Sequence, residues 1–480
     1  MTTLSTHTDA PRTTEDDLTR GFAALKAGFA HDPSPSLETR LATLKRLERA
    51  ILANKDALAE AIRADFGNRS KHETLIAEVF LALENVRYTR AHLAKWMRAE
   101  RRKVSLAFLP ARAQVRYQPK GVVGIIAPWN YPFLLAIAPL IGALGAGNRA
   151  MIKPSELTPR TGELLAKLVE DTFPPDQVRV VTGGVDVGAA FATLPFDHLV
   201  FTGSTHVGKL VMRAAAEHLT PVTLELGGKS PVIVHESYPI EAAADAIALG
   251  KWLNAGQTCI APDYVLVPEH RRDALVEAIE ARLQAAYRSL RDNPDYTSVI
   301  NERHRARLEG YLSDATVQGA RVKVVNPAGE SFEGTNKLPP TMLLDVSDDM
   351  VVMQEEIFGP ILPIVTYRRL EEAIAYVNDH PRPLALYYFD HDAARARRVL
   401  DSTTSGGAAI NACALHFAQD DLPFGGIGPS GMGAYHGREG FETFSHKKAV
   451  FLQARVNASQ LLAPPYGKTI ETALKILMRG

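Results

Sequence analysis

The order of apolar and polar positions divides the chain into a helical N-terminal stretch and a long alternation of strands and helices. Between about residues 15 and 100, apolar side chains recur at three- and four-residue steps, which predicts amphipathic helices. From Gly121 onward, short apolar runs such as VVGIIAP, RAMIKP, VRVVTG, HLVFTG and SPVIV alternate with amphipathic segments. This alternation is typical of βαβ units and predicts an α/β protein built on a parallel sheet. Later runs (YVLVPE, RVKVV, ILPIVTY, ALYYFD and GAAIN) predict a second α/β domain.

Three segments stand outside this alternation. Residues 103–119 (KVSLAFLPARAQVRYQP) predict two strands separated by Pro110, and FSHKKAVFLQ near the C-terminus predicts another strand. The final YGKTIETALKILMRG predicts a short amphipathic helix. Residues 121–148 carry no charge and are long enough to cross a bilayer, but proline and asparagine interrupt them. We therefore expect a buried strand, turn and helix there rather than a membrane span.

Composition narrows the class of protein. A chain of 480 residues and 52.3 kDa is too long for one hydrophobic core, so two or three domains are expected. Lys+Arg and Asp+Glu both number 54, so no net charge favours nucleic acid or an acidic membrane surface. The two cysteines, Cys259 and Cys413, cannot build a disulfide framework and suit a reducing compartment. The polar, acidic N-terminus does not resemble a signal peptide, so a cytoplasmic protein is predicted.

Two motifs indicate nucleotide binding. FTGSTHVGKL follows a strand and begins a helix, so its backbone N–H groups are placed to hold a phosphate. It lacks only the Ser or Thr of a P-loop, where Leu210 stands, so a nucleotide triphosphatase and a simple tight turn both remain open. RAMIKPSELTP places Lys153 and Glu156 just beyond a strand end, where ribose hydroxyls are bound in dinucleotide folds, although ordinary helix capping also explains them.

Three further residues are candidates for covalent chemistry. Glu225 in LELGGKSP is flanked by leucines, and partial burial would raise its pKa toward that of a general base. Cys259 in GQTC follows a glycine turn that a substrate can reach, and a thiolate there is a candidate nucleophile. Asn130 in PWN could donate its amide to a developing oxyanion. No Cys or His lies near Cys259 at ligand spacing, so no metal site is predicted, and Cys413 is interpreted as core filler.

The motifs APWNYP, KPSE, FTGSTHVGK, ELGGKSP, GQTC, EEIFGP and PFGGIGPSGMG occur in this order, and together they resemble the aldehyde dehydrogenase superfamily. The likeness extends from about Arg101 to His446, and Glu225 and Cys259 are 34 residues apart, as in that family. GQTCIAPDYV, LPFGGIGPSGMGAYHG and FETFSHKK resemble the class 3 branch, which includes fatty, aromatic and coniferyl-type aldehyde dehydrogenases.

The resemblance implies a domain organisation. A Rossmann-like dinucleotide-binding domain is expected over residues 1–100 and 120–228, and a catalytic domain over residues 229–435. Residues 101–119 and 436–480 are expected to form a bridging β element and a C-terminal tail that support a homodimer.

The resemblance also implies roles for individual residues. Cys259 would be the nucleophile, Glu225 the base for deacylation, and Asn130 with the backbone N–H of Cys259 the oxyanion hole. NAD, with NADP as a possible second cofactor, would be held by a larger set: Pro128, Trp129, Lys153, Glu156, Gly203, Ser204, Thr205, Val207, Gly208, Leu226, Gly227, Glu356 and Phe358.

The function that the resemblance implies is oxidation of an aromatic or a medium- to long-chain aliphatic aldehyde to its acid. The steps would be formation of a cysteine thiohemiacetal, hydride transfer and hydrolysis of a thioester. A coenzyme A-acylating dehydrogenase is chemically the nearest competitor, and retention of Glu225 favours hydrolysis instead. The nucleotide triphosphatase also stays open, as does a catalytically silent relative of the family. The silent relative would lack the nucleophile, the amide or the base, and all three residues are present.

Overall fold

A computed structural model describes residues 14–457 and 463–478 of the chain. Its N-terminal part is helical, as predicted, and apolar positions of the long second helix such as Leu44, Leu47 and Ile51 are fully buried. Ser36 caps that helix by accepting a hydrogen bond from the backbone of Thr39. The elements are α1 (Glu15–His31), α2 (Leu37–Asp65), α3 (Lys71–Thr74), the π-helical turn η1 (Leu75–Phe80) and α4 (Leu81–Trp96).

The first large sheet has six strands in the order β15-β7-β6-β3-β4-β5. Its strands are parallel except β15, which comes from late in the chain and pairs antiparallel with β7. The strands are β3 (Val122–Ile126), β4 (Arg149–Lys153), β5 (Val178–Val180), β6 (His198–Thr202), β7 (Val222–Glu225) and β15 (Gly431–Met432). The accompanying helices are α5 (Leu134–Ala146), α6 (Pro159–Thr172), α7 (Val185–Ala192) and α8 (Thr205–Ala216).

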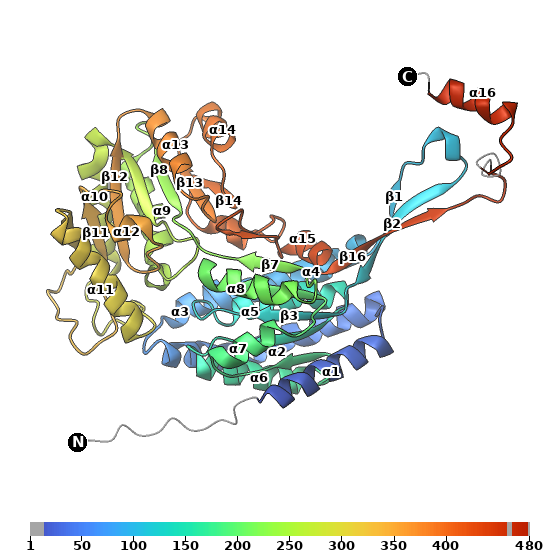
Figure 1. The fold of residues 1–480 in the computed structure, drawn as a ribbon. Coiled ribbons are helices and arrows are strands. Elements are labelled where there is room, and N and C mark those ends of the chain that lie inside the picture. Colours follow the sequence, from blue (N-terminus) through green and yellow to red (C-terminus); the bar gives the residue numbers. More distant parts are fainter. Residues whose placement is uncertain (1–13, 458–462, 479–480) are drawn as a thin grey trace.

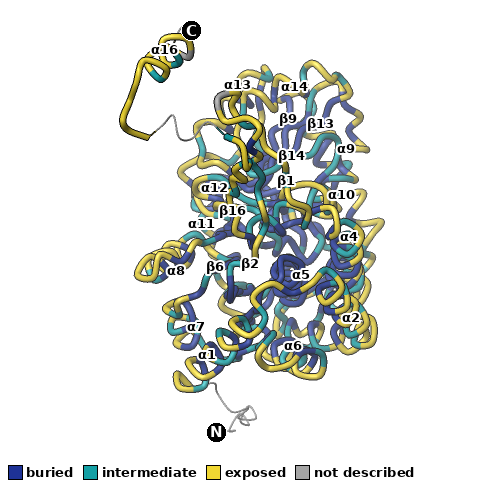
Figure 2. The backbone as a smooth tube through the Cα atoms, turned by 90° about the vertical axis from the view of Figure 1, so that its right-hand side faces the viewer, coloured by how far each residue is buried: buried dark blue, intermediate teal, exposed yellow. Residues whose placement is uncertain are grey.

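The uncharged stretch at residues 121–148 is a buried strand, turn and helix, as predicted. Every residue of α5 is buried, and Figure 2 shows this helix dark blue inside the body of the molecule. Its apolar surface on all sides therefore serves packing within the protein. In the described part of the chain, no helix is both long and apolar enough to span a bilayer.

The second large sheet has seven strands in the order β10-β11-β12-β9-β8-β13-β14, with only β10 antiparallel to its neighbour. The strands are β8 (Pro231–Val234), β9 (Tyr264–Pro268), β10 (Arg321–Val324), β11 (Thr341–Leu344), β12 (Ile361–Tyr367), β13 (Ala385–Phe389) and β14 (Gly407–Ile410). Its helices are α9 (Ile240–Trp252), α10 (Arg272–Ala286), α11 (Glu302–Val317), α12 (Val351–Gln354), α13 (Leu370–Asp379) and α14 (Ala393–Ser402). Short 3₁₀ turns connect some of these elements: η2 (Leu106–Phe108), η3 (Leu253–Gly256), η4 (Glu269–Arg271) and η5 (Leu415–Ala418).

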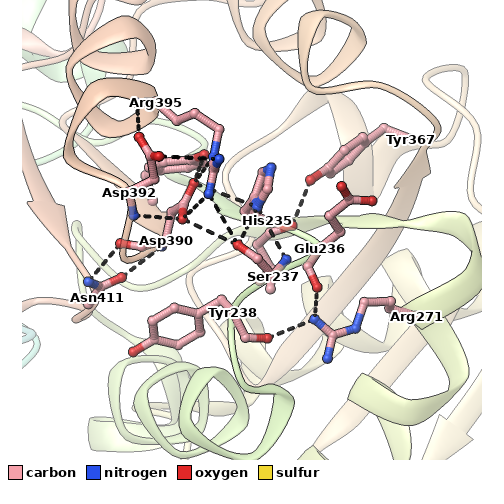
Figure 3. A network of polar contacts seen from close by, with 12 residues as sticks. His235, Glu236, Ser237, Tyr238, Arg271, Tyr367, Asp390, Asp392, Arg395 and Asn411 are labelled. Atoms are coloured by element: carbon pink, nitrogen blue, oxygen red, sulfur yellow. Dashed lines mark hydrogen bonds and ion pairs between the residues drawn. The ribbon is translucent and has the colours of Figure 1, made fainter.

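A polar network ties the carboxyl ends of β8 and β13 to α14 (Figure 3). Asp390 is buried there and accepts hydrogen bonds from Arg395 Nε at 2.6 Å and from the Tyr388 hydroxyl at 2.8 Å. Asn411 bonds both the N–H and the carbonyl of Asp390, at 2.8 and 2.9 Å. These bonds satisfy a buried charge at the sheet edge, so the network stabilises the fold away from the cavity described below.

A third, small sheet projects from the body (Figure 1) and consists of β1 (Glu100–Arg102), β2 (Arg112–Pro119) and β16 (Ser445–Leu452), all antiparallel. The predicted strands at 112–119 and 445–452 are confirmed. The predicted strand over residues 103–109 is wrong: residues 103–105 have no regular structure, residues 106–108 form η2, and Leu106 is 85% exposed with no sheet face to cover it. After β15 come α15 (Gly437–Thr443) and, beyond the arm, the predicted C-terminal helix α16 (Lys468–Leu477).

The predicted α/β fold class is confirmed: two large, mostly parallel sheets and a small antiparallel one. Residues 431–432 belong to the segment that was assigned to the catalytic domain. In the structure they form β15, which pairs with β7 and so lies in the first sheet. The domain boundaries drawn from the sequence stay predictions.

Candidate active site

Most of the predicted site residues line one cavity, which has a volume of about 970 Å³. It lies at the carboxyl ends of β3, β4, β6 and β7 and is closed on the other side by α11 and residues 355–358. Ligands of open α/β sheets bind at such strand ends. The predicted residues that line it are Pro128, Trp129, Asn130, Lys153, Glu156, Gly203, Ser204, Val207, Glu225, Leu226, Gly227, Cys259, Glu356 and Phe358. Thr205 and Gly208, in the first turn of α8, do not line it.

Hydrogen bonds from buried polar side chains fix the loop that carries Cys259. Gln257 is fully buried, donates to the carbonyls of Asn254 and Ser298 at 2.9 and 3.0 Å, and accepts from the N–H of Ile300 at 2.9 Å. Asn254 and Ala255 have φ values of +53° and +51°; asparagine tolerates this left-handed region, but alanine adopts it only when its surroundings hold it there. Gly256 also has a positive φ, and a Cβ on it would lie 2.3 Å from the Gly359 carbonyl oxygen. The GQTC motif is therefore a rigid, crowded turn.

Cys259 carries a half-buried thiol beside two carboxyl groups. Burial raises the pKa of Cys259 far above its ordinary value, and the nearby Glu356 and Glu225 raise it further. The backbone N–H groups of Cys259 and Ile260 act in the opposite direction. The thiol is thus protonated in the free protein, and a base must take its proton before the sulfur can attack.

Glu225 is placed to be that base. It ends β7, is 2% exposed, and burial raises its pKa well above the ordinary carboxyl value, as the flanking leucines predicted. Among the described residues, neither carboxylate oxygen has a hydrogen-bond partner. A carboxylate with a raised pKa is a stronger base than an exposed one, and its free oxygens can accept a proton from the thiol or from water.

Glu356 is the second carboxyl at the thiol. Burial and the charge of Asp263 raise its pKa to about 8, against the effects of the Gly228 N–H, Lys229 and Arg307. A Cβ on Gly227 would lie 1.9 Å from Glu356 Oε2, so only glycine lets this carboxyl approach the end of β7.

Asn130 follows β3 and is almost completely buried at the wall of the cavity. Its loop is joined to the cysteine loop at two points. The Nδ2 of Asn254 donates to the carbonyl of Asn130 at 3.0 Å, and the hydroxyls of Tyr131 and Thr258 lie 2.7 Å apart. The two residues that the sequence pairs as nucleophile and oxyanion donor therefore lie on directly connected loops.

The other end of the cavity has the features that a dinucleotide requires. Lys153 ends β4, is 3% exposed, and pairs with Glu156 at 3.1 Å, so both polar heads face the place where a ribose would lie. Ser204 caps α8, whose first N–H groups point toward the cavity end. A Cβ on Gly203 would lie 2.6 Å from the ring of Phe201, so this turn has room for glycine alone. These residues fit NAD or NADP.

Sequence reasoning missed the contribution of α11. Arg303, His304 and Arg307 line the cavity although they belong to no motif that suggested nucleotide binding. The ring of Trp129 lies 5.1 Å from that of His304, and Arg307 Nη2 donates to the carbonyl of Ile357 at 2.8 Å. In the sequence, this helix is marked only by Asn301, which caps its first residues ERHR. A capping residue gives no indication that the helix binds a ligand. In the described ranges, no three His, Cys, Asp or Glu side chains gather as a metal site would require.

Comparison with known proteins agrees with this geometry. Residues 2–450 match the profile of the "Aldehyde dehydrogenase family". The chain is 57% identical to "Probable coniferyl aldehyde dehydrogenase" of Pseudomonas aeruginosa, over 94% of both chains. It is also 41% identical to "Aldehyde dehydrogenase family 3 member A2" of Rattus norvegicus, over 93% of this chain and 91% of that one.

Solved structures show the same likeness. The "Substrate bound state of Staphylococcus Aureus AldH" superposes with a TM-score of 0.90 at 40% identity, covering 96% of this chain and 99% of that one. The Mycobacterium tuberculosis aldehyde dehydrogenase "complexed with NAD+" superposes with a TM-score of 0.84 at 31% identity, covering 94% and 92%. The fold, the cavity and the sequence match lead to one conclusion: this chain belongs to the aldehyde dehydrogenase family and is an NAD(P)-dependent aldehyde dehydrogenase.

Proposed function

We propose that the chain oxidises aryl-propenal aldehydes of the coniferyl type to their carboxylic acids, with NAD as the preferred cofactor. The observation that carries this proposal is the 57% identity, over 94% of both chains, with a relative named for coniferyl aldehyde. Family membership removes the nucleotide triphosphatase from consideration.

Rings close to the nucleophile support an aromatic substrate. Cys259 packs against a hydrophobic cluster that contains Phe424 and Tyr387, and the Tyr387 hydroxyl donates to the Ile260 carbonyl at 2.6 Å. Phe417 meets Phe424 edge to face at 4.7 Å. Tyr387 and Phe424 are buried, so the half-buried ring of Phe417 is the one that a flat conjugated aldehyde could meet by stacking or edge contacts.

The chain's residues perform the chemistry in two stages. In the first stage, Glu225 takes the thiol proton as the Cys259 sulfur bonds to the aldehyde carbon, and the carbonyl electrons move to oxygen. The Asn130 amide and the Cys259 N–H stabilise that oxygen. NAD, held by residues such as Lys153, Glu156 and Ser204, would supply the hydride acceptor, and loss of the hydride from the tetrahedral carbon would leave a thioester on Cys259. Before the second stage, Glu225 releases the thiol proton to solvent. It then takes a proton from water, whose oxygen attacks the thioester carbon, and the displaced Cys259 sulfur takes that proton from Glu225. Because the base is present, hydrolysis is favoured over release to coenzyme A.

The preference for NAD rests on Glu156. Its carboxylate lines the cavity, where it can accept hydrogen bonds from ribose hydroxyls and would repel a 2′-phosphate. Lys153, 3.1 Å from that carboxylate, offsets part of the repulsion, so NADP is expected as a usable second cofactor.

A kinetic panel tests substrate and cofactor together. We expect the highest kcat/KM for coniferyl aldehyde, followed by cinnamaldehyde, with benzaldehyde and a series of saturated alkanals lower. Each substrate is measured with NAD and with NADP. A saturated alkanal with a higher kcat/KM than coniferyl aldehyde would overturn the substrate proposal, and a clear advantage for NADP would overturn the cofactor proposal.

The projecting sheet supports assembly as a homodimer. Phe108, Leu109 and Phe451 on this arm are each about half exposed, and exposed strand edges with apolar side chains are normally covered by another chain. We expect light scattering to give twice the chain mass of 52.3 kDa. In such a dimer α16, whose Leu474 and Ile476 are exposed, would cover further apolar surface. Deletion of residues 461–480 should then give tetramers or aggregates, whereas a full-length monomer at micromolar concentration would contradict the proposal.

A cytoplasmic location is proposed from the two cysteines, both of which are free. A nucleophilic thiol requires a reducing compartment to stay active. Fractionation of cells that express the chain, followed by an activity assay, tests this location.

A further inference from the structure

A fully buried pair of opposite charges lies directly behind the cavity. Arg69 Nη1 and Glu78 Oε1 are 2.8 Å apart, and both side chains are 0% exposed. Glu78 stands on the π-helical turn η1, a distortion found frequently at functional sites. Removing two charges from water is costly, and further hydrogen bonds offset part of that cost. Arg69 Nη1 and Glu78 Oε2 make such bonds, whereas Arg69 Nε and Nη2 have no hydrogen-bond partner among the described residues. The destination of those hydrogen bonds shows what the pair does.

The pair bonds the backbone at both ends of residues 130–134. Arg69 Nη1 donates to the carbonyl of Asn130 at 2.9 Å. Glu78 Oε2 accepts from the N–H groups of Phe133 and Leu134 at 2.9 and 3.0 Å, where α5 begins. The carboxylate thus takes the place of a helix cap, and the guanidinium fixes the peptide that carries the Asn130 side chain.

The same guanidinium also reaches the cysteine loop through one ring. It lies over the ring of Tyr131 at 4.7 Å, and the Tyr131 hydroxyl is 2.7 Å from that of Thr258, the residue before Cys259. Asn254, in the strained turn before Cys259, donates to the same Asn130 carbonyl at 3.0 Å. One planar cation therefore contacts the loop of the amide donor directly and the loop of the nucleophile through Tyr131.

We propose that Arg69 and Glu78 are positioning residues: they fix the position and direction of the Asn130 side-chain amide relative to the Cys259 sulfur. The inference rests on the proposed role of Asn130 as oxyanion donor. A donor stabilises a developing oxyanion only when it points at the position that the oxygen will occupy, and a misplacement of about 1 Å costs about 100-fold in rate.

The chain provides a matched control at the opposite end of α5. Arg40 is 4% exposed and donates to the carbonyls of Gly145 and Ala146 at 3.1 and 2.8 Å, remote from the residues that line the cavity. Arg40→Lys and Arg69→Lys both replace a planar guanidinium, which can donate several hydrogen bonds in fixed directions, by a compact ammonium group in a buried site. Both variants are expected to lose thermal stability, so stability alone does not distinguish a positioning role from a structural one.

The distinguishing measurement is the rate of the NADH burst, recorded at a temperature where circular dichroism shows every variant folded. Arg69→Lys should slow the burst at least about tenfold at saturating aldehyde, with the Kd for NAD unchanged, whereas Arg40→Lys should leave the burst rate within about twofold. In an Asn130→Ala background, Arg69→Lys should slow the burst little further, because the group that it positions is already gone.

The burst rates of these variants separate the oxyanion assignment of Asn130 from the positioning role of Arg69 and Glu78. If Asn130→Ala does not slow the burst, the oxyanion assignment fails. If Asn130→Ala is slow but Arg69→Lys behaves like Arg40→Lys, the positioning proposal fails. Should Arg69→Lys not fold, Glu78→Gln replaces it, since the amide keeps the shape and one acceptor oxygen while weakening both the ion pair and the hold on α5. A normal burst in folded Glu78→Gln then overturns the proposal.

Discussion

The raised pKa of Glu356 predicts that this carboxyl destabilises the folded protein at alkaline pH. Burial raises its pKa from the ordinary 4.5 to about 8, so between these values the folded state holds a proton that the unfolded state has lost. Stability falls with rising pH wherever the folded state binds more protons. The destabilisation is therefore absent below about pH 4.5, grows as pH rises, and is complete above about pH 8. Glu356→Gln, which has no proton to lose, escapes it.

The size of the effect follows from the pKa and from the position of the side chain. At about 1.4 kcal/mol for each pH unit, the interval from 4.5 to about 8 corresponds to at most about 5 kcal/mol. Glu356 also lines the cavity and is only half-buried, so water reaches one edge of the carboxylate and reduces this penalty. We expect a net gain of about 2 kcal/mol for Glu356→Gln at pH 8.5, or roughly 4 °C in Tm.

The assay is thermal unfolding of the cofactor-free protein at pH 5.5, 7.0 and 8.5. The difference in Tm between Glu356→Gln and wild type is taken at each pH, because other titrating groups cancel in that difference. Glu277→Gln, which alters an exposed carboxyl on α10, is the control and should give a flat difference. A difference for Glu356→Gln that stays constant from pH 5.5 to 8.5 would refute the reasoning.

Three further substitutions test the site. Cys259→Ala should lower kcat for aldehyde oxidation by at least about 1,000-fold, while fluorescence titration still detects NAD binding; turnover near that of wild type would remove the thiol from the mechanism. Glu225→Gln should slow both the NADH burst and the steady state, because the same carboxylate takes the thiol proton before hydride transfer and the proton of water afterwards; an unchanged steady state in stopped-flow would exclude a role in hydrolysis. Gly227→Ala places a Cβ 1.9 Å from Glu356 Oε2. The free energy of unfolding should therefore fall by about 1–3 kcal/mol, which a thermal scan records as a lower Tm. Gly310→Ala, with no atom within 4 Å of the new Cβ, should match or exceed the wild-type Tm in the same scan.

The sequence alone predicted the fold class, and every site residue that it assigned except Thr205 and Gly208 lines the cavity. Alternation of apolar runs with amphipathic helices is a local property, so α5 and the strands beside it were predictable although their stretch lacks charge. The glycine turn before α8 and the GQTC turn could also be recognised, because backbone constraints act over a few residues. The prediction of a strand at residues 103–109 failed because an apolar run becomes a strand only when a neighbouring strand supplies hydrogen bonds and a face to cover.

Only the tertiary structure decided which distant groups share one environment. The pKa of Glu356 depends on burial and on Asp263, 93 positions earlier in the chain, and no local pattern encodes that proximity. Arg69 and Glu78 look in the sequence like ordinary charges near a helix start, yet they are fully buried against the Asn130 loop. Their role follows from desolvation and hydrogen-bond geometry, which exist only once residues far apart in the chain have packed together.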